Sequence, residues 1–240
     1  MKNFFFSVPS EEFKAKPIEQ RKQIIFEPIS REVEQAVPYL GEHWKMQDNR
    51  SDKLTNKIVY NTQTFREVEE CYQKHPVGDF SYLAHRWYNK KTSTMTEDIF
   101  CSYSVARREK NIKHKTIDFY LMNIPFDLKL TSFPKKFGKQ RGDYSSDRSY
   151  RNDLIRWLYE NQSKGDRNHE KNRIFVVCKH EKGLNSKNNL LLKKDFKQIN
   201  DKVKTFLNYS SKKYEKGEEP FNKVTLNSGK TVYSEVIFIY

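Results

Sequence analysis

Cysteine is scarce in this chain, and the few that occur form no familiar pattern. Cys71, Cys101 and Cys178 stand far apart, without a Cys-x-x-Cys pair. Neither a disulfide framework nor a zinc site is therefore indicated. The six histidines are scattered and show no metal-ligand spacing.

Long apolar runs are also missing. No stretch is long enough to span a bilayer, and the opening MKNFFFSVPS has too short an apolar core for a signal peptide. No strongly basic amphipathic helix with a wide apolar face is apparent. These absences argue against a membrane partner and, with the cysteine pattern, predict a cytoplasmic location. There is no G-x-G-x-x-G or Walker loop, so nucleotide binding of those kinds is unsupported.

Positive charge and aromatic residues are abundant. The 240 residues carry a net charge of +14, spread along the whole chain, which indicates a polyanionic partner. With 32% charged residues and a mean hydropathy of −0.93, disorder would be conceivable. However, 17 Phe and 14 Tyr supply large surfaces to bury, so we expect one folded domain, with or without an appended subdomain.

Residues 115–134 have the pattern of two short strands joined by a tight turn at Asn123-Ile124. Apolar and polar residues alternate in both, which is the signature of strands with one buried face. The apolar set is Ile117, Phe119, Leu121, Phe126, Leu128 and Leu130. A two-residue loop at that point would set Asp118 opposite Lys129 and Tyr120 opposite Asp127. Both acids and the lysine would then share the polar face.

These three side chains together could take part in catalysis. Two carboxylates a few ångströms apart repel each other unless they are protonated or hold a cation, and a hard divalent ion is the usual solution. A lysine beside them can stabilise developing negative charge or position a water. An ordinary amphipathic hairpin with surface charges would have the same sequence pattern.

An Asp, a short gap and then Asp-x-Lys on adjoining strands resembles the PD-(D/E)xK nuclease superfamily, the fold of many type II restriction endonucleases. Asp118 matches the first acid, Asp127 the second and Lys129 the lysine, whereas Ile117 stands where the motif has a loosely kept proline. The likeness covers about residues 95–180 as an order of strands and helices. It implies hydrolysis of DNA with Mg²⁺, for which Mn²⁺ substitutes, held by Asp118 and Asp127.

The resemblance also implies an acid on the helix before these strands, as a further metal ligand or base. Glu97 is the residue that would match it. The spacing Thr94-x-x-Glu97 is equally that of a capping box, which would make Glu97 a simple helix cap. Asp98 and Glu69 are the alternative third acids.

A basic, glycine-containing loop follows the two strands, and a helix with arginines off its apolar face follows the loop. Such residues suit phosphate contacts, which position nucleic acid without reading its sequence, although charge runs are often merely solvated. The predicted DNA-binding residues are Lys135, Lys136, Lys139, Arg141, Arg148 and Arg151.

The remaining patterns predict an α/β fold: a restriction-endonuclease-like core with a mixed central sheet flanked by helices (residues 91–240), and a mostly helical N-terminal region (residues 1–90) packed on it. We expect helices at 30–37, from 64, from 79, from 94, at 147–162 and at 190–209, strands at 57–60 and 173–178, a loop at 181–189, and closing strands around Asn227-Ser228-Gly229.

The leading functional hypothesis, by resemblance, is a metal-dependent endonuclease of restriction type acting on DNA. Repair, mobile-element and anti-phage nucleases share the fold, so the fold does not choose among these roles. The first alternative is a nucleic-acid-binding protein with a nuclease-like fold and no catalysis; the second is a basic structural or interaction protein, including one that binds RNA. Symmetric cutting of both strands would suggest a homodimer.

Overall fold

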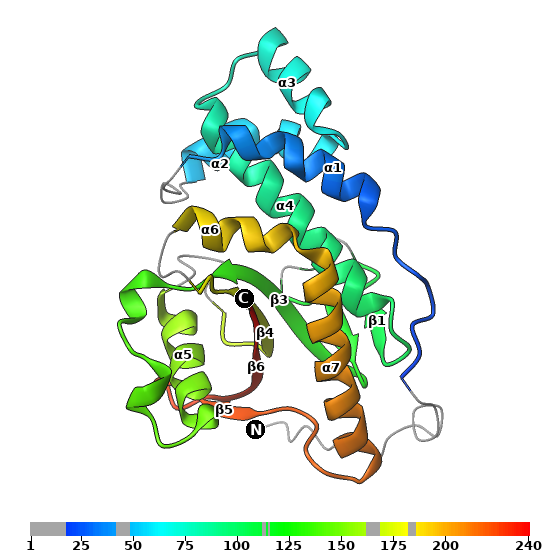
Figure 1. Ribbon diagram of the computed structural model, residues 1–240, viewed down its shortest axis with the longest axis vertical. Helices are drawn as coiled ribbons and strands as arrows, with labels where there is room; N and C mark the ends of the chain where they lie inside the picture. Colours follow the sequence, from blue (N-terminus) through cyan, green and yellow to red (C-terminus); the bar gives the residue numbers. More distant parts are fainter. Residues whose placement is uncertain (1–17, 42–48, 112–113, 115, 162–168, 182–185) are drawn as a thin grey trace.

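A six-stranded mixed sheet organises the fold (Figure 1). The computed structural model describes residues 18–41, 49–111, 114, 116–161, 169–181 and 186–240. The strands are β1 (Ala106–Arg108), β2 (Phe119–Leu121), β3 (Ile124–Ser132), β4 (Arg173–Cys178), β5 (Lys223–Thr225) and β6 (Thr231–Ile239), in the spatial order β1-β2-β3-β4-β6-β5. Strands β1, β2 and β3 form an antiparallel meander, β3, β4 and β6 run parallel, and β5 returns antiparallel to β6.

Helices cover both faces of this sheet. They are α1 (Glu27–Ala36), α2 (Asn49–Asn61), α3 (Phe65–Lys74), α4 (Phe80–Cys101), α5 (Asp147–Asn161), α6 (Ser186–Leu191) and α7 (Phe196–Glu215), with 3₁₀ turns at Val37–Tyr39, Lys135–Phe137, Arg141–Asp143 and Leu192–Lys194. Figure 1 shows α1, α2 and α3 gathered around the first half of α4, beyond the edge of the sheet. The sheet thus has α5 on one face and α4 with α7 on the other.

Strand β4 is buried on both faces, as its apolar run predicts. Ile174 and Val176 pack into the core shared with α4 and α7, whereas Phe175 and Val177 pack into the core shared with α5. All six of its residues are buried. A continuous apolar stretch is what a central parallel strand requires, because neither of its faces meets water.

The hairpin between β2 and β3 forms, but its turn lies one residue earlier than expected. Met122 and Asn123 occupy it, with φ of 49° and 63°, as a tight turn compatible with the twist of the strands requires. Phe119 therefore pairs with Phe126, and extending this register by one residue sets Asp118 against Asp127 rather than Lys129. A shift of two residues keeps each side chain on its face, so the acids and the lysine remain neighbours.

Three local predictions fail because tertiary contacts override the local pattern. Residues 57–60 lie in α2 rather than in a strand, since Asp52, Thr55 and Val59 are buried at helical spacing against α4. Thr94 opens no helix: α4 begins at its N-cap Asp79 and passes through residue 90, the expected boundary between the two regions, without a break.

The third failure concerns residues 181–209. A short helix, α6, occupies part of the expected loop, and α7 begins at Phe196, capped by Asp195, and continues to Glu215. The capping box at Thr64–Glu67, the helix from residue 147 and the closing strands are confirmed. None of the helices in the described ranges is long and apolar enough to cross a membrane.

Substitution of Asn123 tests the hairpin geometry. A valine at this exposed position should lower the free energy of unfolding by about 1–2 kcal/mol, because a β-branched residue is strained at positive φ. Asn123→Gly should leave it within about 0.5 kcal/mol, since glycine adopts positive φ without strain. Urea unfolding of both variants measures the difference; equal stabilities would contradict the assigned turn.

Candidate active site

Three carboxylates near the first half of β3 form two neighbouring pairs, Glu97 with Asp118 and Asp118 with Asp127. Glu97 comes from α4, Asp118 from the residue before β2, and Asp127 from β3. Burial, followed by the negative charge of Asp127, raises the pKa of Asp118. Burial, followed by the charge of Asp118, raises the pKa of Glu97 to about 7. The structure thus brings all three predicted acids into one electrostatic neighbourhood.

Lys129 belongs to the same cluster. Its Nζ lies 3.0 Å from Oδ1 of Asp127, two residues earlier on the same face of β3. One third of its side chain is exposed, whereas that of Asp127 is almost wholly buried. Solvent therefore reaches part of the Lys129 side chain, unlike that of Asp127.

Asp127 has a second partner, Arg173, that the sequence reasoning missed. Nε of Arg173 lies 2.5 Å from Oδ2 of Asp127, and the two residues are directly paired across β3 and β4. The guanidinium is fully buried and lies over the ring of Tyr159, at 5.1 Å from its centroid. The only sequence signal was an arginine opening an otherwise apolar strand, where a buried charge requires a partner.

His169 completes the surroundings of Asp127. Its Nε2 lies 3.9 Å from Oδ2 of Asp127 and 3.1 Å from a guanidinium nitrogen of Arg173. Burial, followed by the charge of Arg173, lowers the pKa of His169 and favours the neutral ring. A neutral imidazole can accept a hydrogen bond from the arginine, and thus helps to orient it.

Glu97 is not a helix cap. It lies near the carboxyl end of α4, far from the N-cap Asp79, where its carboxylate accepts a hydrogen bond from Arg108 at 2.9 Å, and the same guanidinium binds Asp98 at 2.6 Å. Lys90 stands two turns earlier on α4, and its positive charge acts on Glu97 and Asp118. Among the alternative acids, Asp98 is exposed beside Arg108, and Glu69 lies on α3, bound to the Tyr39 hydroxyl.

Carboxylates are the donors that Mg²⁺ prefers, so the cluster fits this ion in its chemistry. Within the described ranges, however, no group of three or more His, Cys, Asp and Glu residues is spaced to hold a metal ion. Glu97 is bound by Arg108, Asp127 by Arg173 and Lys129, and Asp118 accepts the Leu128 N–H at 2.6 Å. Shared coordination would require some of these contacts to open.

The predicted DNA-binding residues of the basic loop lie beyond the other end of β3, whereas Arg148 and Arg151 belong to α5. Five residues of strand, roughly 16 Å at 3.3 Å per residue, separate Asp127 from Ser132, after which the basic loop begins. Lys135, Lys136 and Arg148 are exposed. Lys139 pairs with Asp153, while Arg141 and Arg151 both pair with Asp147. The loop and the acids therefore do not form one compact site.

The structure defines the class of this protein as α/β, with a mixed six-stranded sheet flanked by helices. Comparisons of the chain with protein-family models, with curated proteins and with solved structures found no match. Function must therefore be inferred from the geometry and charge of the site.

Replacement of Arg173 tests the buried ion pair. Arg173→Met should lower the free energy of unfolding by about 3–5 kcal/mol, because it leaves the buried Asp127 carboxylate without its closest cation. The control is Arg66→Met, which breaks the exposed pair with Glu70 and should cost less than about 1 kcal/mol. Denaturant unfolding measures both, and similar losses in the two variants would contradict a structural role for Arg173.

Glu97 should make stability depend on pH. Its pKa rises from the ordinary value of 4.5 to about 7 on folding, so the folded state favours the protonated acid. That stabilisation is complete below the unfolded pKa and is lost as the pH rises through about 7. Glu97→Gln, which cannot ionise, should therefore gain stability relative to wild type between pH 5 and 8, by up to about 3 kcal/mol.

Thermal unfolding across this pH range measures the gain. Asp98→Asn is the matched control, since it removes the neighbouring acid from the same arginine at an exposed position. A difference between Glu97→Gln and wild type that stays constant with pH would show that Glu97 is not buried among acids.

Proposed function

We propose that this protein is a metal-dependent nuclease that hydrolyses DNA phosphodiester bonds, with its active site at Glu97, Asp118, Asp127 and Lys129. The observation that carries the proposal is the placement of Asp118 between two other acids: burial and the charge of Asp127 raise the pKa of Asp118, and burial and the charge of Asp118 raise the pKa of Glu97. Folding alone gains nothing from such an arrangement, and strongly perturbed pairs of this kind concentrate at functional sites.

Each residue has a role that follows from its surroundings. Asp118 and Asp127 would hold Mg²⁺ or Mn²⁺, with Glu97 either as a further ligand or as the general acid or base; when bound, the ion supplies charge stabilisation at the phosphate and an activated water. Lys129, partly exposed beside Asp127, stabilises negative charge that develops on the phosphate oxygens or orients the attacking water. Glu97, with a pKa of about 7, exchanges its proton near neutral pH, as a general acid or base must.

Two features of the chain support this reading. The order of α4, the β2–β3 hairpin, α5 and the buried strand β4 agrees with the order that the resemblance to PD-(D/E)xK nucleases implies. The net charge of +14 suits a polyanionic substrate, because phosphate neutralisation drives the association of proteins with DNA. The restriction-type role rests on the resemblance alone.

One observation favours a second candidate, a nucleic-acid-binding protein without catalysis. Arg173 and Lys129 already neutralise Asp127, so this acid has its charge satisfied without any metal ion. A site in which arginine replaces the cation keeps the fold and the basic surface but loses the chemistry. The two candidates differ in whether a divalent ion binds and whether DNA is cut.

Cleavage of plasmid DNA tests the proposal. The purified protein should nick or cut it with Mg²⁺ or Mn²⁺ and not with EDTA. Asp118→Asn should abolish cleavage by removing a charged ligand, and Lys129→Ala should abolish it by losing charge stabilisation. Glu97→Gln should lower turnover strongly, whereas the control Asp98→Asn should cut nearly as wild type. Gel analysis of supercoiled, nicked and linear forms gives the rates.

Asp127→Asn is a weaker test, because it also leaves Arg173 buried without its partner and so perturbs the fold. Wild-type cleavage rates in both Asp118→Asn and Lys129→Ala would place the active site elsewhere. If no DNA is cut and calorimetry detects no divalent ion, but binding falls steeply with salt, the second candidate is correct.

A further inference from the structure

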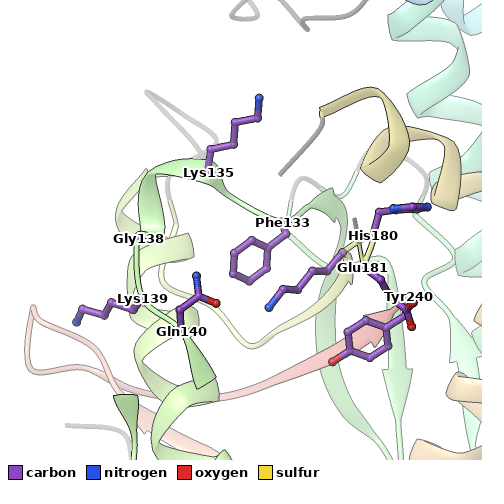
Figure 2. A pocket seen from close by; sticks show the side chains of 9 residues that line it. Phe133, Lys135, Gly138, Lys139, Gln140, His180, Glu181 and Tyr240 are labelled. Carbon is purple, nitrogen blue, oxygen red and sulfur yellow. The ribbon is translucent and has the colours of Figure 1, made fainter. Parts of the chain in front are cut away.

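A pocket of about 550 Å³ lies at the carboxyl end of the parallel strands, opposite to the acids (Figure 2). The residue directly after each of the three strands lines it: Phe133 after β3, Lys179 after β4 and Tyr240 after β6. Its volume falls in the range of small-ligand sites, and the carboxyl ends of parallel strands are where α/β sheets most often bind ligands.

The strand register sets these three residues in one row. Ser132 pairs with Cys178, and Cys178 with Ile239. The ladder continues one step further, since the Phe133 N–H donates to the Cys178 carbonyl at 2.8 Å and the Lys179 N–H donates to the Ile239 carbonyl at 2.7 Å. The backbone of Phe133 and Lys179 therefore continues the sheet by one step beyond the strands.

Lys179 is the central charge of the pocket. Its Nζ lies 4.6 Å from the ring centroid of Phe133 and 5.9 Å from that of Tyr150. In the part of the chain that the structure describes, no carboxylate lies within ion-pair distance of it. Aromatic faces stabilise an ammonium but do not neutralise it, so its charge remains available to an anion.

The opposite wall is the basic loop. Lys135 and Gln140 line the pocket from there, and Gly138 allows the loop to turn back at a φ of 67°. In Figure 2 the Gln140 amide faces Phe133, whereas Lys139 extends away, toward its partner Asp153, and the Lys135 side chain also points away from Phe133 and Tyr240. The lining contains a single acidic side chain, Glu181, against three lysines.

Tyr240 adds a flat, accessible surface. Its side chain is about half exposed, at 48%, and its ring stacks on Phe238 at 5.8 Å. Its backbone N–H and carbonyl are both bound by the Gln198 side chain, at 2.7 Å each, which fixes the residue in place. An open aromatic ring beside an uncompensated ammonium offers a base to stack on and a charge to hold a phosphate.

We infer that this pocket binds a nucleotide through its phosphate, with Lys179 contacting the phosphate, Lys135 adding positive charge at the rim and Tyr240 stacking on the base. The nucleotide is either a free mononucleotide or the phosphorylated end of a nucleic-acid strand, which share this chemistry. The inference does not rest on the proposed cleavage, because the pocket and the acids lie at opposite ends of β3.

Binding without cleavage is the appropriate test. Calorimetry in EDTA with adenosine monophosphate and with inorganic phosphate, and fluorescence anisotropy with short single strands carrying a 5′-phosphate or a 5′-hydroxyl, provide the affinities. Lys179→Gln should weaken binding of adenosine monophosphate at least about tenfold, or about 1.4 kcal/mol. Lys135→Gln should also weaken it, and because Lys135 is exposed at the rim this variant keeps the test decisive if Lys179→Gln is unstable.

The control is Lys74→Gln, which removes the same charge from an exposed lysine of α3 that does not line the pocket, and should bind as wild type. Tyr240→Leu should weaken the mononucleotide more than inorganic phosphate. Asp118→Asn should bind adenosine monophosphate as wild type does, whether or not the wild-type protein cleaves DNA. The absence of nucleotide binding and the absence of DNA cleavage are therefore separate results.

The two possible ligands, a strand end and a free nucleotide, predict different orders of affinity for the probes. Tighter binding of the 5′-phosphorylated strand than of adenosine monophosphate identifies a strand end, and the reverse identifies a free nucleotide. The inference is overturned if none of these probes binds at millimolar concentration, or if wild type, Lys179→Gln and Lys135→Gln bind them equally.

Discussion

The buried ion pair between Asp127 and Arg173 is the interaction on which the centre of this structure depends. It joins β3 to β4 at the amino end of the sheet, where a charged side chain could not remain without a partner. Neighbouring contacts use the same end of β4: the Arg173 carbonyl accepts from Ser234 on β6, and Asn172 binds the Pro125 carbonyl and the Tyr233 N–H. These contacts join the first residues of β3, β4 and β6. They also hold Asp127 in place.

This arrangement divides the acids into two kinds. Asp127 has two cations, whereas Asp118 and Glu97 share an environment in which burial and repulsion disfavour their charged forms. A proton and a divalent cation are alternative ways to relieve that repulsion, so the two should compete. Protons and the divalent cation would compete for Glu97 near neutral pH, because the pKa of Glu97 is about 7. If the proposed metal ion binds, the same repulsion links the stability of the fold, the protonation of Glu97 and the affinity for the ion.

The two ends of β3 carry different side chains: buried carboxylates paired with arginine and lysine at one end, and, among the described residues, a lysine without a bound carboxylate at the other. Carboxylates gather where the strand begins, and lysines with open aromatic surface gather where it ends. A single strand of the sheet thereby separates the chemistry proposed for cleavage from the surface suited to holding phosphate. A nucleic acid that contacts both would have to extend along the sheet for more than the length of β3.

The sequence by itself determined the features that neighbouring residues encode. Alternation marked the hairpin, the apolar run marked β4, and the spacing of Thr64 and Glu67 marked a helix start, because each depends on side chains a few residues apart. The sequence also predicted that Asp118, Asp127 and Lys129 are neighbours. This prediction is independent of the exact turn, because moving the turn by one residue shifts the strand register by two and leaves every side chain on the same face of the sheet.

Only the tertiary structure decided which distant residues meet. Arg173 lies 46 positions after Asp127, and nothing local indicates that the two pair across parallel strands. Thr94 and Glu97 have the spacing of a capping box, but α4 packs against α1, α2 and α7 and continues past both residues without a break. The row of Phe133, Lys179 and Tyr240 arises from strand register alone. Partner choice depends on the free energy of the whole core, which no short window of sequence contains.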